Sequence, residues 1–304
     1  MYHYVRPIMQ SKYPNIKGLE FADFSFQLDF LSENYNFVTA EEVIYSIKNQ
    51  KKLSENSCWL TFDDGYKDHY DYVFPELKKR GIQGSFFPPA HAIKNNEMLD
   101  VNCIHFILAC QNDIKSLNED LENECYDRGI SKKQFINLKK NFYISSRFDS
   151  ADVRFFKNML QHALPASVRK NVINKLFLKH VKQSPQEFSK KLYMTKDELN
   201  ELIESNMFIG SHGSMHYWLD KLNKKNQELD IDESLEFLED IGVKLSDWIM
   251  CYPYGGYNKN TLDLLNKKNC SVGLTVKPEI ANLTQHNNLE LPRFDTNDFP
   301  QKPV

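Results

Sequence analysis

Several features that direct a chain to a membrane, to nucleic acid or into a disulfide framework are missing from this sequence. No run approaches the roughly 18 consecutive apolar residues that cross a bilayer, and residues 1–7 show no charged segment followed by an apolar one. The 38 lysines and arginines face 41 aspartates and glutamates, which gives a net charge of −3 and no broad basic field for nucleic acid. We therefore expect a cytoplasmic protein without a transmembrane segment or nucleic-acid partners, and a leader trimmed ahead of Met1 is left open.

The cysteines also lack the spacing of a metal or redox motif. Internal repeats and low-complexity tracts are likewise missing. The six cysteines stand at positions 58, 103, 110, 125, 251 and 270, and no two form a Cys-x-x-Cys pair. Several lie in apolar runs, where a free cysteine behaves as a small hydrophobic residue. We therefore predict reduced cysteines in the core.

What the sequence does contain is an alternation of short apolar runs and helical patterns. A length of 304 residues exceeds a typical single domain, whereas barrels commonly run to about 250 residues as one unit. Patterns of the Thr-x-x-Glu type at Thr39 and Thr195 predict two helix starts. Helices are expected at residues 21–35, 66–80 and 258–268, and strands at residues 58–62, 84–88, 207–211, 271–276 and 289–294. This alternation predicts an α/β fold with a parallel barrel.

Residues 94–193 depart from this alternation. The segment shows long helical periodicity and is rich in lysine, asparagine, glutamate and phenylalanine, with few strand signals. Its expected helices cover residues 102–111, 132–142, 153–164 and 167–181. We predict a helical insertion between two barrel strands. Two interpretations stay open for it: a lid or subunit interface, or a helical bundle on the surface.

Two short motifs carry the chemistry. Residues 61–65 read Thr-Phe-Asp-Asp-Gly, and residues 211–216 read Ser-His-Gly-Ser-Met-His. Each follows a brief apolar run that predicts a strand, so the acids and the first histidine are expected at strand ends. If the chain turns into a helix after His212, His216 lies one turn later on the same face, and both imidazoles converge on one ion. Taken alone, each pattern is also typical of a turn or of two solvated histidines.

In this context the sequence resembles the polysaccharide deacetylase family, also called NodB-like or carbohydrate esterase family 4. The two motifs match those of the family in type and spacing, with Gly213 in place of the usual hydroxyl residue. Residues 251–256, which read Cys-Tyr-Pro-Tyr-Gly-Gly, are similar to its third motif. The resemblance covers most of residues 1–95 and 190–295. It implies a distorted (β/α) barrel of about seven strands, formed by residues 1–304 as one domain, with the active site at the carboxyl ends of the strands.

The resemblance also implies a metal site made by Asp64, His212 and His216. A His-His-Asp set suits zinc and leaves positions for water and a substrate oxygen, and the ion lowers the pKa of bound water toward roughly 7. Adjacent residues on an extended strand point apart, so Asp63 is free for another task. With Asp64 on the metal, Asp63 is the candidate general base that takes a proton from the water.

The third motif departs from the common family form, because Cys251 stands where an arginine normally orients the base. We predict that Arg293, at the end of a late strand, braces Asp63 instead; an ordinary surface salt bridge is the other interpretation. The backbone N–H of Tyr254 is the implied oxyanion donor alongside the metal.

The proton donor has two candidates. Most family members use a histidine in a late Leu-x-His motif, and after the third motif this chain has His286, within a polar segment that predicts a loop. Members that resemble the poly-N-acetylglucosamine deacetylases carry the histidine in an N-terminal Tyr-His sequence, which Tyr2 and His3 match. His3 is therefore the favoured general acid; a core histidine bonded within the barrel is the other interpretation of it.

These residues predict a zinc-type de-N-acetylase that hydrolyses the acetamido group of an N-acetylated sugar. The expected substrate is a nucleotide-, lipid- or glycan-linked sugar of cell-envelope glycan biosynthesis (O-antigen, capsule or lipid-linked polysaccharide). An O-acetyl esterase or deformylase with the same machinery is the nearest rival, followed by an amidase on small cyclic ureides or imides. A non-catalytic glycan-binding relative is disfavoured because both histidines and both aspartates are retained. The oligomeric state is left open.

Overall fold

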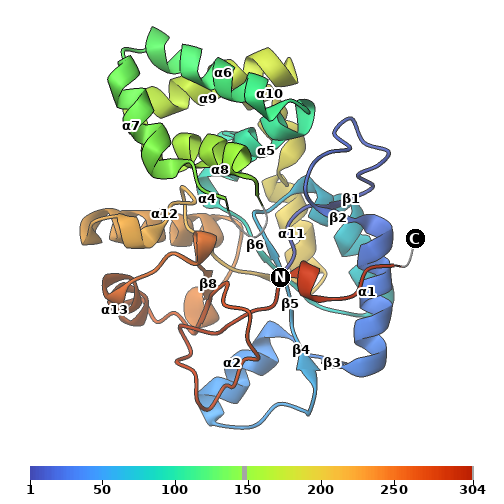
Figure 1. The fold of residues 1–304 in the computed structure, drawn as a ribbon. Coiled ribbons are helices and arrows are strands. Elements are labelled where there is room, and N and C mark those ends of the chain that lie inside the picture. Colours follow the sequence, from blue (N-terminus) through green and yellow to red (C-terminus); the bar gives the residue numbers. More distant parts are fainter. Residues whose placement is uncertain (146–148, 303–304) are drawn as a thin grey trace. The chain divides into compact units, whose positions relative to one another are not determined.

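The structure is a computed structural model that describes residues 1–145 and 149–302, and it divides into two compact units. The first unit comprises Met1–Pro7, Gly18–Glu97 and the chain from Lys190 onward. The second comprises Ile8–Lys17 and Met98–Ser189. Among the described residues the strands all belong to the first unit, whereas the second is helical (Figure 1).

Every strand pair among the described residues is parallel. The strands are β1 (Val5–Arg6), β2 (Leu19–Glu20), β3 (Asn36–Phe37), β4 (Ser57–Cys58), β5 (Leu60–Asp63), β6 (Gly84–Phe87), β7 (Phe208–Ile209), β8 (Ile249–Cys251) and β9 (Val272–Leu274). They pair in the orders β1-β2, β3-β4, β5-β6-β7 and β8-β9. Single parallel bridges join Tyr2 to Phe62, Ser211 to Met250 and Leu274 to Leu291. The prediction of an α/β fold with parallel strands is confirmed.

Helices separate these strands along the chain. They are α1 (Phe21–Asn34), α2 (Ala40–Asn49), α3 (Phe74–Arg80), α4 (Ala90–Asn95), α11 (Lys196–Glu204), α12 (Lys224–Asp240) and α13 (Lys259–Lys267), with 3-10 turns at Leu219–Lys221, Leu245–Asp247, Pro253–Gly255 and Thr296–Asp298. Thr39 begins α2 by accepting a hydrogen bond from the Glu42 N–H at 3.1 Å, and the Glu42 carboxylate accepts one from the Thr39 N–H at 2.8 Å. Thr195 and Glu198 make the same reciprocal pair at the start of α11. Both predicted helix starts are confirmed.

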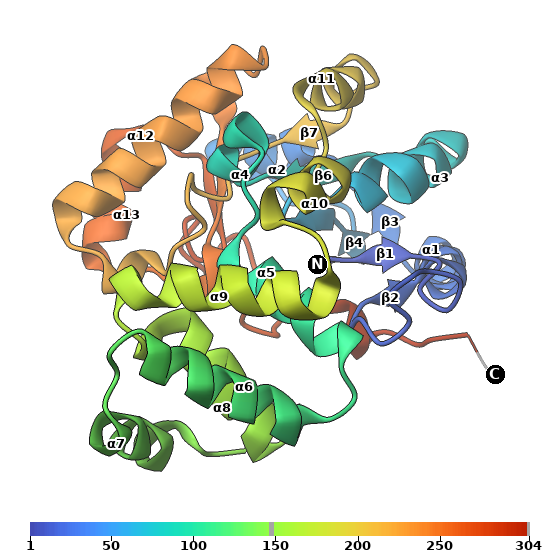
Figure 2. The same ribbon diagram turned by 90° about the horizontal axis from the view of Figure 1, so that it is seen from above.

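The central strands are buried on both faces. Each residue of β5 and β6 is buried, as is typical of parallel strands covered by helices. The ring of Phe62 on β5 stacks on Phe86 at 4.9 Å and on Tyr2 at 5.2 Å between centroids. Helices α1, α2, α12 and α13 lie outside the strands of this unit (Figures 1 and 2).

The late strand predicted at residues 289–294 was wrong. A single bridge at Leu291 takes its place. Pro292 has no N–H for a ladder, and the Arg293 N–H donates to the Lys277 carbonyl, beyond the end of β9. The segment thus leaves the sheet one residue before the arginine and turns its side chain inward.

Two further segments of the first unit depart from a regular strand or helix. Tyr2 makes only a single bridge to β5, so the first regular strand is β1, which begins after His3. The helix predicted at residues 66–80 begins beyond Tyr66, and its first part is a π-helix, η1 (His69–Val73), that continues into α3. π-helical turns are rare and are frequently found at functional sites.

The second unit contains helices α5 (Asp100–Cys110), α6 (Ile114–Asp127), α7 (Lys132–Phe142), α8 (Ala151–Asn158) and α9 (Ala166–Val181), with a π-helix, η2 (Met159–Ala163), and α10 (Pro185–Leu192) at its boundary. Four of these segments were predicted, whereas α6 and α10 were not. The unit begins four residues inside the predicted insertion of 94–193 and ends four residues before its end. It also includes Ile8–Lys17, where the Tyr13 ring packs against Phe106 at 4.9 Å.

The cysteines are all free thiols. Four of them are buried, at positions 103, 125, 251 and 270, and Cys58 is half-buried. Cys110, at the end of α5, is exposed, so the prediction of a core position was wrong for this residue.

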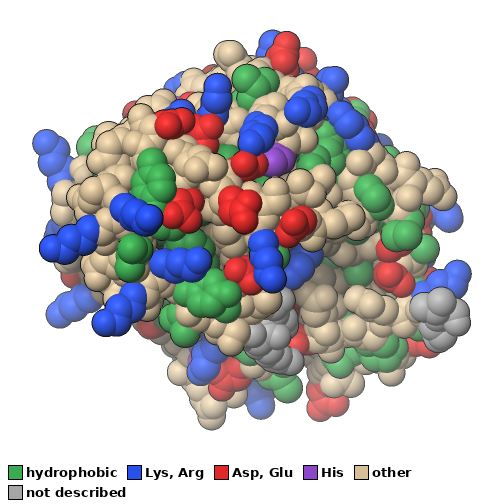
Figure 3. Space-filling model, turned by 45° about the horizontal axis from the view of Figure 1, so that its top comes forward, with side chains coloured by type: hydrophobic (Ala, Val, Ile, Leu, Met, Phe, Trp, Pro, Cys, Tyr) green, Lys and Arg blue, Asp and Glu red, His purple; other side chains and the backbone are tan. Residues whose placement is uncertain are grey.

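The charges are mixed in sign on the surface. Lysine and arginine side chains lie among aspartate and glutamate on the face shown in Figure 3. No described helix is both long and apolar enough to cross a membrane.

Candidate metal centre and active site

The two aspartates lie where β5 ends. Asp63 is the last residue of the strand, and Asp64 follows it with a φ of 72°, in the left-handed region that few non-glycine residues adopt. The strand therefore ends at Asp63, whereas the prediction placed both acids on one extended strand. The turn still sends the two carboxylates to different partners, and both side chains are buried.

The histidine segment is a loop and not the helix that the spacing had allowed. No regular secondary structure is assigned between His212 and His216. His216 has a φ of 56°, which folds the loop back so that both imidazoles face Asp64. Asp64 Oδ1 lies 3.1 Å from His216 Nε2 and 3.4 Å from His212 Nε2. The convergence expected of the motif is thus present, although a different backbone produces it.

These three side chains fit a single divalent cation. Each offers one ligand atom, and the atoms all lie within 4.8 Å of one another. A tetrahedral zinc ion with bonds of 2.0 to 2.1 Å holds neighbouring ligand atoms about 3.3 to 3.4 Å apart, close to the two distances to Asp64 Oδ1. Burial raises the pKa of Asp64, but hydrogen bonds from His212 and His216 outweigh it and hold the pKa well below its usual range. The carboxylate is therefore ionised, as a ligand must be.

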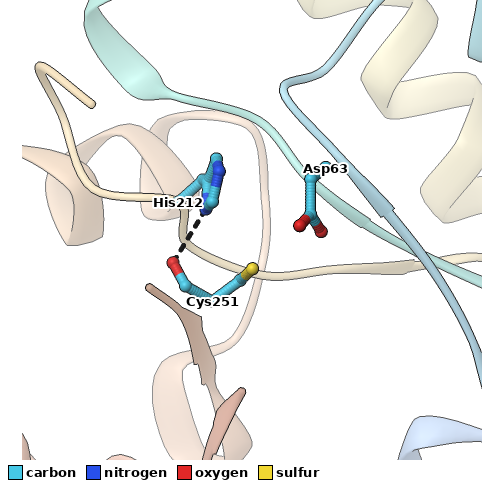
Figure 4. Close-up of side chains that lie close together, drawn as sticks. All are labelled: Asp63, His212 and Cys251. Atoms are coloured by element: carbon cyan, nitrogen blue, oxygen red, sulfur yellow. Dashed lines mark hydrogen bonds between the residues drawn. The ribbon is translucent and has the colours of Figure 1, made fainter. Parts of the chain in front are cut away.

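Groups behind the ligands fix their orientation. The Tyr66 hydroxyl donates to Asp64 Oδ2 at 2.5 Å, which leaves Oδ1 toward the imidazoles. His212 Nδ1 lies 2.8 Å from the Cys251 carbonyl oxygen, so Nδ1 carries an N–H and Nε2 is the atom that would bind a cation (Figure 4). Outer contacts of this kind set the tautomer and direction of metal ligands. Tyr66 was not predicted as part of the site, although it directly follows the Asp-Asp-Gly motif.

A second group, Asp63, His212 and Cys251, also brings three possible ligand atoms together (Figure 4). Burial raises the pKa of the Cys251 thiol, which disfavours the thiolate that a metal requires. Both oxygens of Asp63 are also hydrogen-bonded elsewhere. The set with Asp64 therefore fits a cation better.

Arg293 makes a forked ion pair with Asp63. Its Nη1 and Nη2 donate to the two carboxylate oxygens at 2.9 and 2.8 Å. Its other donors reach the Thr275 carbonyl oxygen (2.9 Å), Thr61 Oγ1 (3.1 Å) and Cys251 Sγ (3.1 Å). Arg293 is only 7% exposed, so this is not the surface salt bridge considered as the other interpretation. Burial raises the pKa of Asp63, but the guanidinium outweighs it and holds the pKa well below its usual range.

His3 reaches the same carboxylate from the N-terminal segment. Its Nε2 lies 3.9 Å from Asp63 Oδ2, and its side chain is 42% exposed. The Tyr2 N–H donates to Thr61 and the Asp63 N–H donates to Tyr2, which fixes this segment beside β5. A gap of 3.9 Å is too short for a substrate carbonyl to lie between His3 and Asp63 in this arrangement. An exposed imidazole, however, changes rotamer rapidly.

Buried His69, on η1, anchors the backbone of His3. Its Nε2 lies 2.7 Å from the His3 carbonyl oxygen, which requires the N–H on Nε2. Burial lowers the pKa of His69 to about 4, so the ring is neutral near pH 7. This histidine was not predicted to lie near the site.

Tyr254 extends an aromatic wall beside the histidines. Its φ is 56°, and its ring lies 4.6 Å from those of both His216 and Trp218. The left-handed backbone is a strained conformation of the kind that clusters at functional sites. His286, the alternative acid, is half-buried on a loop, where its Nδ1 accepts from the Asn282 N–H at 2.9 Å. It lines a cavity of about 420 Å³ with Gly255 and Pro292, the neighbours of Tyr254 and Arg293.

Known proteins share both sequence and fold with this chain. A family model described as Polysaccharide deacetylase matches residues 50–131 and 139–273. The Bacillus subtilis protein YxkH is 36% identical over 66 residues, which are 21% of this chain and 24% of YxkH. The match thus spans about a quarter of the length of that curated relative.

The fold resembles that of several solved deacetylases. The deacetylase PplD of Streptococcus pyogenes, in complex with acetate, aligns with a TM-score of 0.58 and 17% identity over 97% of this chain and 89% of its own. IcaB from Ammonifex degensii aligns at 0.57 and 17% over 96% and 89%. The de-N-acetylase from Aggregatibacter actinomycetemcomitans aligns at 0.55 and 16% over 97% and 93%. These likenesses show the (β/α)-barrel-like fold predicted from the sequence.

Proposed function

The chain belongs to the polysaccharide deacetylase family, and on that premise we propose that it is a metal-dependent de-N-acetylase of an N-acetylated sugar. The family is one of hydrolases that act on an amide or ester of an acetylated carbohydrate. The proposed substrate is a nucleotide-, lipid- or glycan-linked sugar of cell-envelope glycan biosynthesis, and zinc is the proposed ion.

One observation carries this proposal: three side chains that could bind a cation lie directly beside a carboxylate that is not one of them. Asp64, His212 and His216 converge, while the adjacent Asp63 is held by Arg293. Hydrolysis of an amide needs a water nucleophile and an acceptor for its proton, and the two carboxylates divide these tasks.

The proposed roles follow from positions. Asp64, His212 and His216 would hold the cation, which would supply Lewis acidity and make water a better nucleophile. Asp63 accepts a proton from the water that attacks the carbonyl carbon, and Arg293 keeps the carboxylate in one orientation. The Tyr254 N–H donates to the oxygen on which negative charge develops. His3 donates the proton that the departing amine requires, after its side chain turns toward the nitrogen.

The test is acetate release from N-acetylated sugar nucleotides, oligosaccharides and lipid-linked sugars by the zinc-loaded protein. We expect release from at least one class, and loss of release by roughly 10²-fold or more in Asp63→Asn with zinc content unchanged. Asp71→Asn, a change at a half-exposed aspartate of η1 on the same segment, is the matched control and should keep full activity.

The outcomes separate the rivals. Release of acetate from O-acetylated sugars alone identifies an esterase, and release of formate identifies a deformylase. Loss of zinc in Asp63→Asn reverses the roles of the two acids. No acyl release from any substrate by a zinc-loaded protein contradicts the proposal.

A further inference from the structure

The loop that carries the two histidines rests on one face of α12. Asp230 Oδ2 accepts a hydrogen bond from the Ser214 N–H at 3.0 Å, and Oδ1 accepts one from the Met215 N–H at 2.8 Å. Asp230 is only 4% exposed, so these two backbone N–H groups bond to its carboxylate in place of water. Carboxylate bonds to backbone N–H groups are among the stronger hydrogen bonds in proteins.

Two more residues of the same helix face hold the loop. Glu233 accepts from the Ser214 hydroxyl at 2.8 Å, and the hydroxyls of Ser234 and Ser211 lie 2.8 Å apart. Positions 230, 233 and 234 are three and four residues apart, which places them on one side of a helix. The contacts begin immediately before His212 and end immediately before His216, so they span the segment between the ligands.

Gly213 lies so close to the Asp230 carboxylate that no side chain fits at this position. Its φ is 69°, and a Cβ at this position would lie 2.6 Å from Asp230 Oδ2. From the other side, the backbone N–H groups of Ala90 and His91 on α4 donate to the carbonyls of Gly213 and Ser214 at 3.1 and 3.0 Å. The loop backbone is therefore fixed through its N–H groups by α12 and through its carbonyls by α4.

We propose that Asp230 is a positioning residue for the metal centre, and that it acts by holding the backbone of residues 213–215 so that both imidazoles reach one ion. The left-handed conformation at His216 persists only because the surroundings enforce it, and the two bonds of Asp230 lie directly before that residue. The inference rests on the proposed function only in taking His212 and His216 as ligands of a metal ion.

The first test measures the zinc affinity of metal-free protein by competition with a chromophoric chelator. Asp230→Asn preserves the shape of the side chain but replaces one acceptor oxygen by an amide donor that faces a backbone N–H. We expect zinc to bind about 10- to 100-fold more weakly, as is typical when an outer contact of a metal ligand is lost. The matched control is Glu236→Gln, an exposed position of the same helix, which should bind zinc as the wild type does.

The second test pairs Gly213→Ala with Asp230→Ala. Alone, Gly213→Ala sets a methyl group against the carboxylate and should weaken zinc binding. In the Asp230→Ala background the contact is gone, so adding Gly213→Ala should cost a smaller factor. Neighbouring residues that share a contact are non-additive in this way. Strictly additive losses would show that the carboxylate is not what requires glycine here.

The third test records hydrogen exchange of the Ser214 and Met215 amides in folded, metal-free protein. We expect slow exchange in the wild type and faster exchange in Asp230→Asn, with exchange of the β5 and β6 amides unchanged. Equal rates at both amides in the two proteins overturn the inference. Faster exchange with unchanged zinc affinity also overturns it, because Asp230 is then a structural residue only.

Failure of this inference is distinguishable from failure of the proposed function. A wild-type protein that binds zinc but releases no acetate contradicts the proposed function and leaves the role of Asp230 standing. Unchanged zinc affinity in Asp230→Asn, in a protein that does release acetate, has the opposite meaning. A wild-type protein that binds no zinc overturns both.

Discussion

Single residues in this site are recruited from distant parts of the chain. The guanidinium of Arg293 engages Asp63, 230 positions away, and its five N–H donors all find acceptors. Cys251 leaves room for it and accepts one of those bonds. The sequence motifs predicted which residue types meet here, because the acids and the first histidine each follow a predicted strand, and the carboxyl ends of barrel strands lie together. The distances could not be predicted, because they depend on how Pro292 turns the chain out of the sheet.

The fork of Arg293 should set the pH dependence of activity. Arg293→Lys offers one compact charge in place of two parallel donors, so we expect activity to fall by at least about 10-fold. The guanidinium lowers the pKa of Asp63, so weakening the pair raises that pKa and shifts the acidic limb of the pH–rate profile to higher pH. Arg80→Lys, which alters a partly exposed arginine paired with Glu76, is the control. An acidic limb at the same pH in Arg293→Lys and the wild type contradicts the bracing role.

The loss of activity on removing His3 should be larger for a substrate with a poorer leaving group. His3→Ala should bind zinc normally and hydrolyse amides at a rate lower by about 10² or more, whereas an activated ester, which departs without a proton, should be hydrolysed at a similar rate. The measurement is the ratio of amide to ester turnover in the wild type, His3→Ala and His286→Ala. Equal losses on both substrates, or a larger ratio change in His286→Ala, assign the proton donor elsewhere.

Among the elements, the π-helix η1 is where local pattern and observed structure part most clearly. The pattern from Tyr66 to Arg80 predicted one continuous helix, and α3 does cover its last part. Periodicity does not reveal the π-helix at residues 69–73. Its buried His69 bonds to the His3 carbonyl and packs against Phe62, and contacts with other segments leave no trace in the local pattern. The two capped helix starts were predictable for the opposite reason, since a capping box is complete within four residues.

The burial of His69 should make folding sensitive to acid. Its pKa of about 4 in the folded state lies below the ordinary value of 6.5, so between these values the unfolded chain binds the extra proton. Stability is therefore lost as pH falls through this range, by about 2 to 3 kcal/mol at pH 4.5 relative to pH 7.5. His69→Gln keeps a donor near the Nε2 position and does not titrate, so its unfolding free energy should lack this loss.

The measurement for His69 is urea unfolding of both proteins at the two pH values. The difference between them is diagnostic, because the neighbouring Asp68 acts in the opposite sense: burial outweighs Arg6 and raises its pKa to about 6, so its contribution falls as pH rises. Parallel pH curves for His69→Gln and the wild type contradict the assignment of a neutral buried ring.

At the scale of the whole molecule, the fold class followed from alternation and the helical unit from a change of period. Both are properties of long segments, in which many residues contribute to one hydrophobic pattern. The inclusion of Ile8–Lys17 in the helical unit did not follow, because the aromatic contact of Tyr13 with Phe106 joins segments with no shared pattern. The contact between α12 and the loop of His212 and His216 could not be predicted for the same reason. In the sequence Asp230 is one acid among several in residues 224–240, and only the fold places it against Gly213.

The central claim is that one cation, bound by Asp64, His212 and His216, is required for deacetylation. The most direct measurement is acetate release as a function of zinc added to chelator-treated protein, with the His212→Ala/His216→Ala double variant in parallel. We expect the wild type to regain activity in proportion to bound zinc up to one ion per chain, and the folded double variant to bind no zinc tightly and release no acetate. Full activity in the chelated wild type, or stoichiometric zinc in the double variant, would contradict the account.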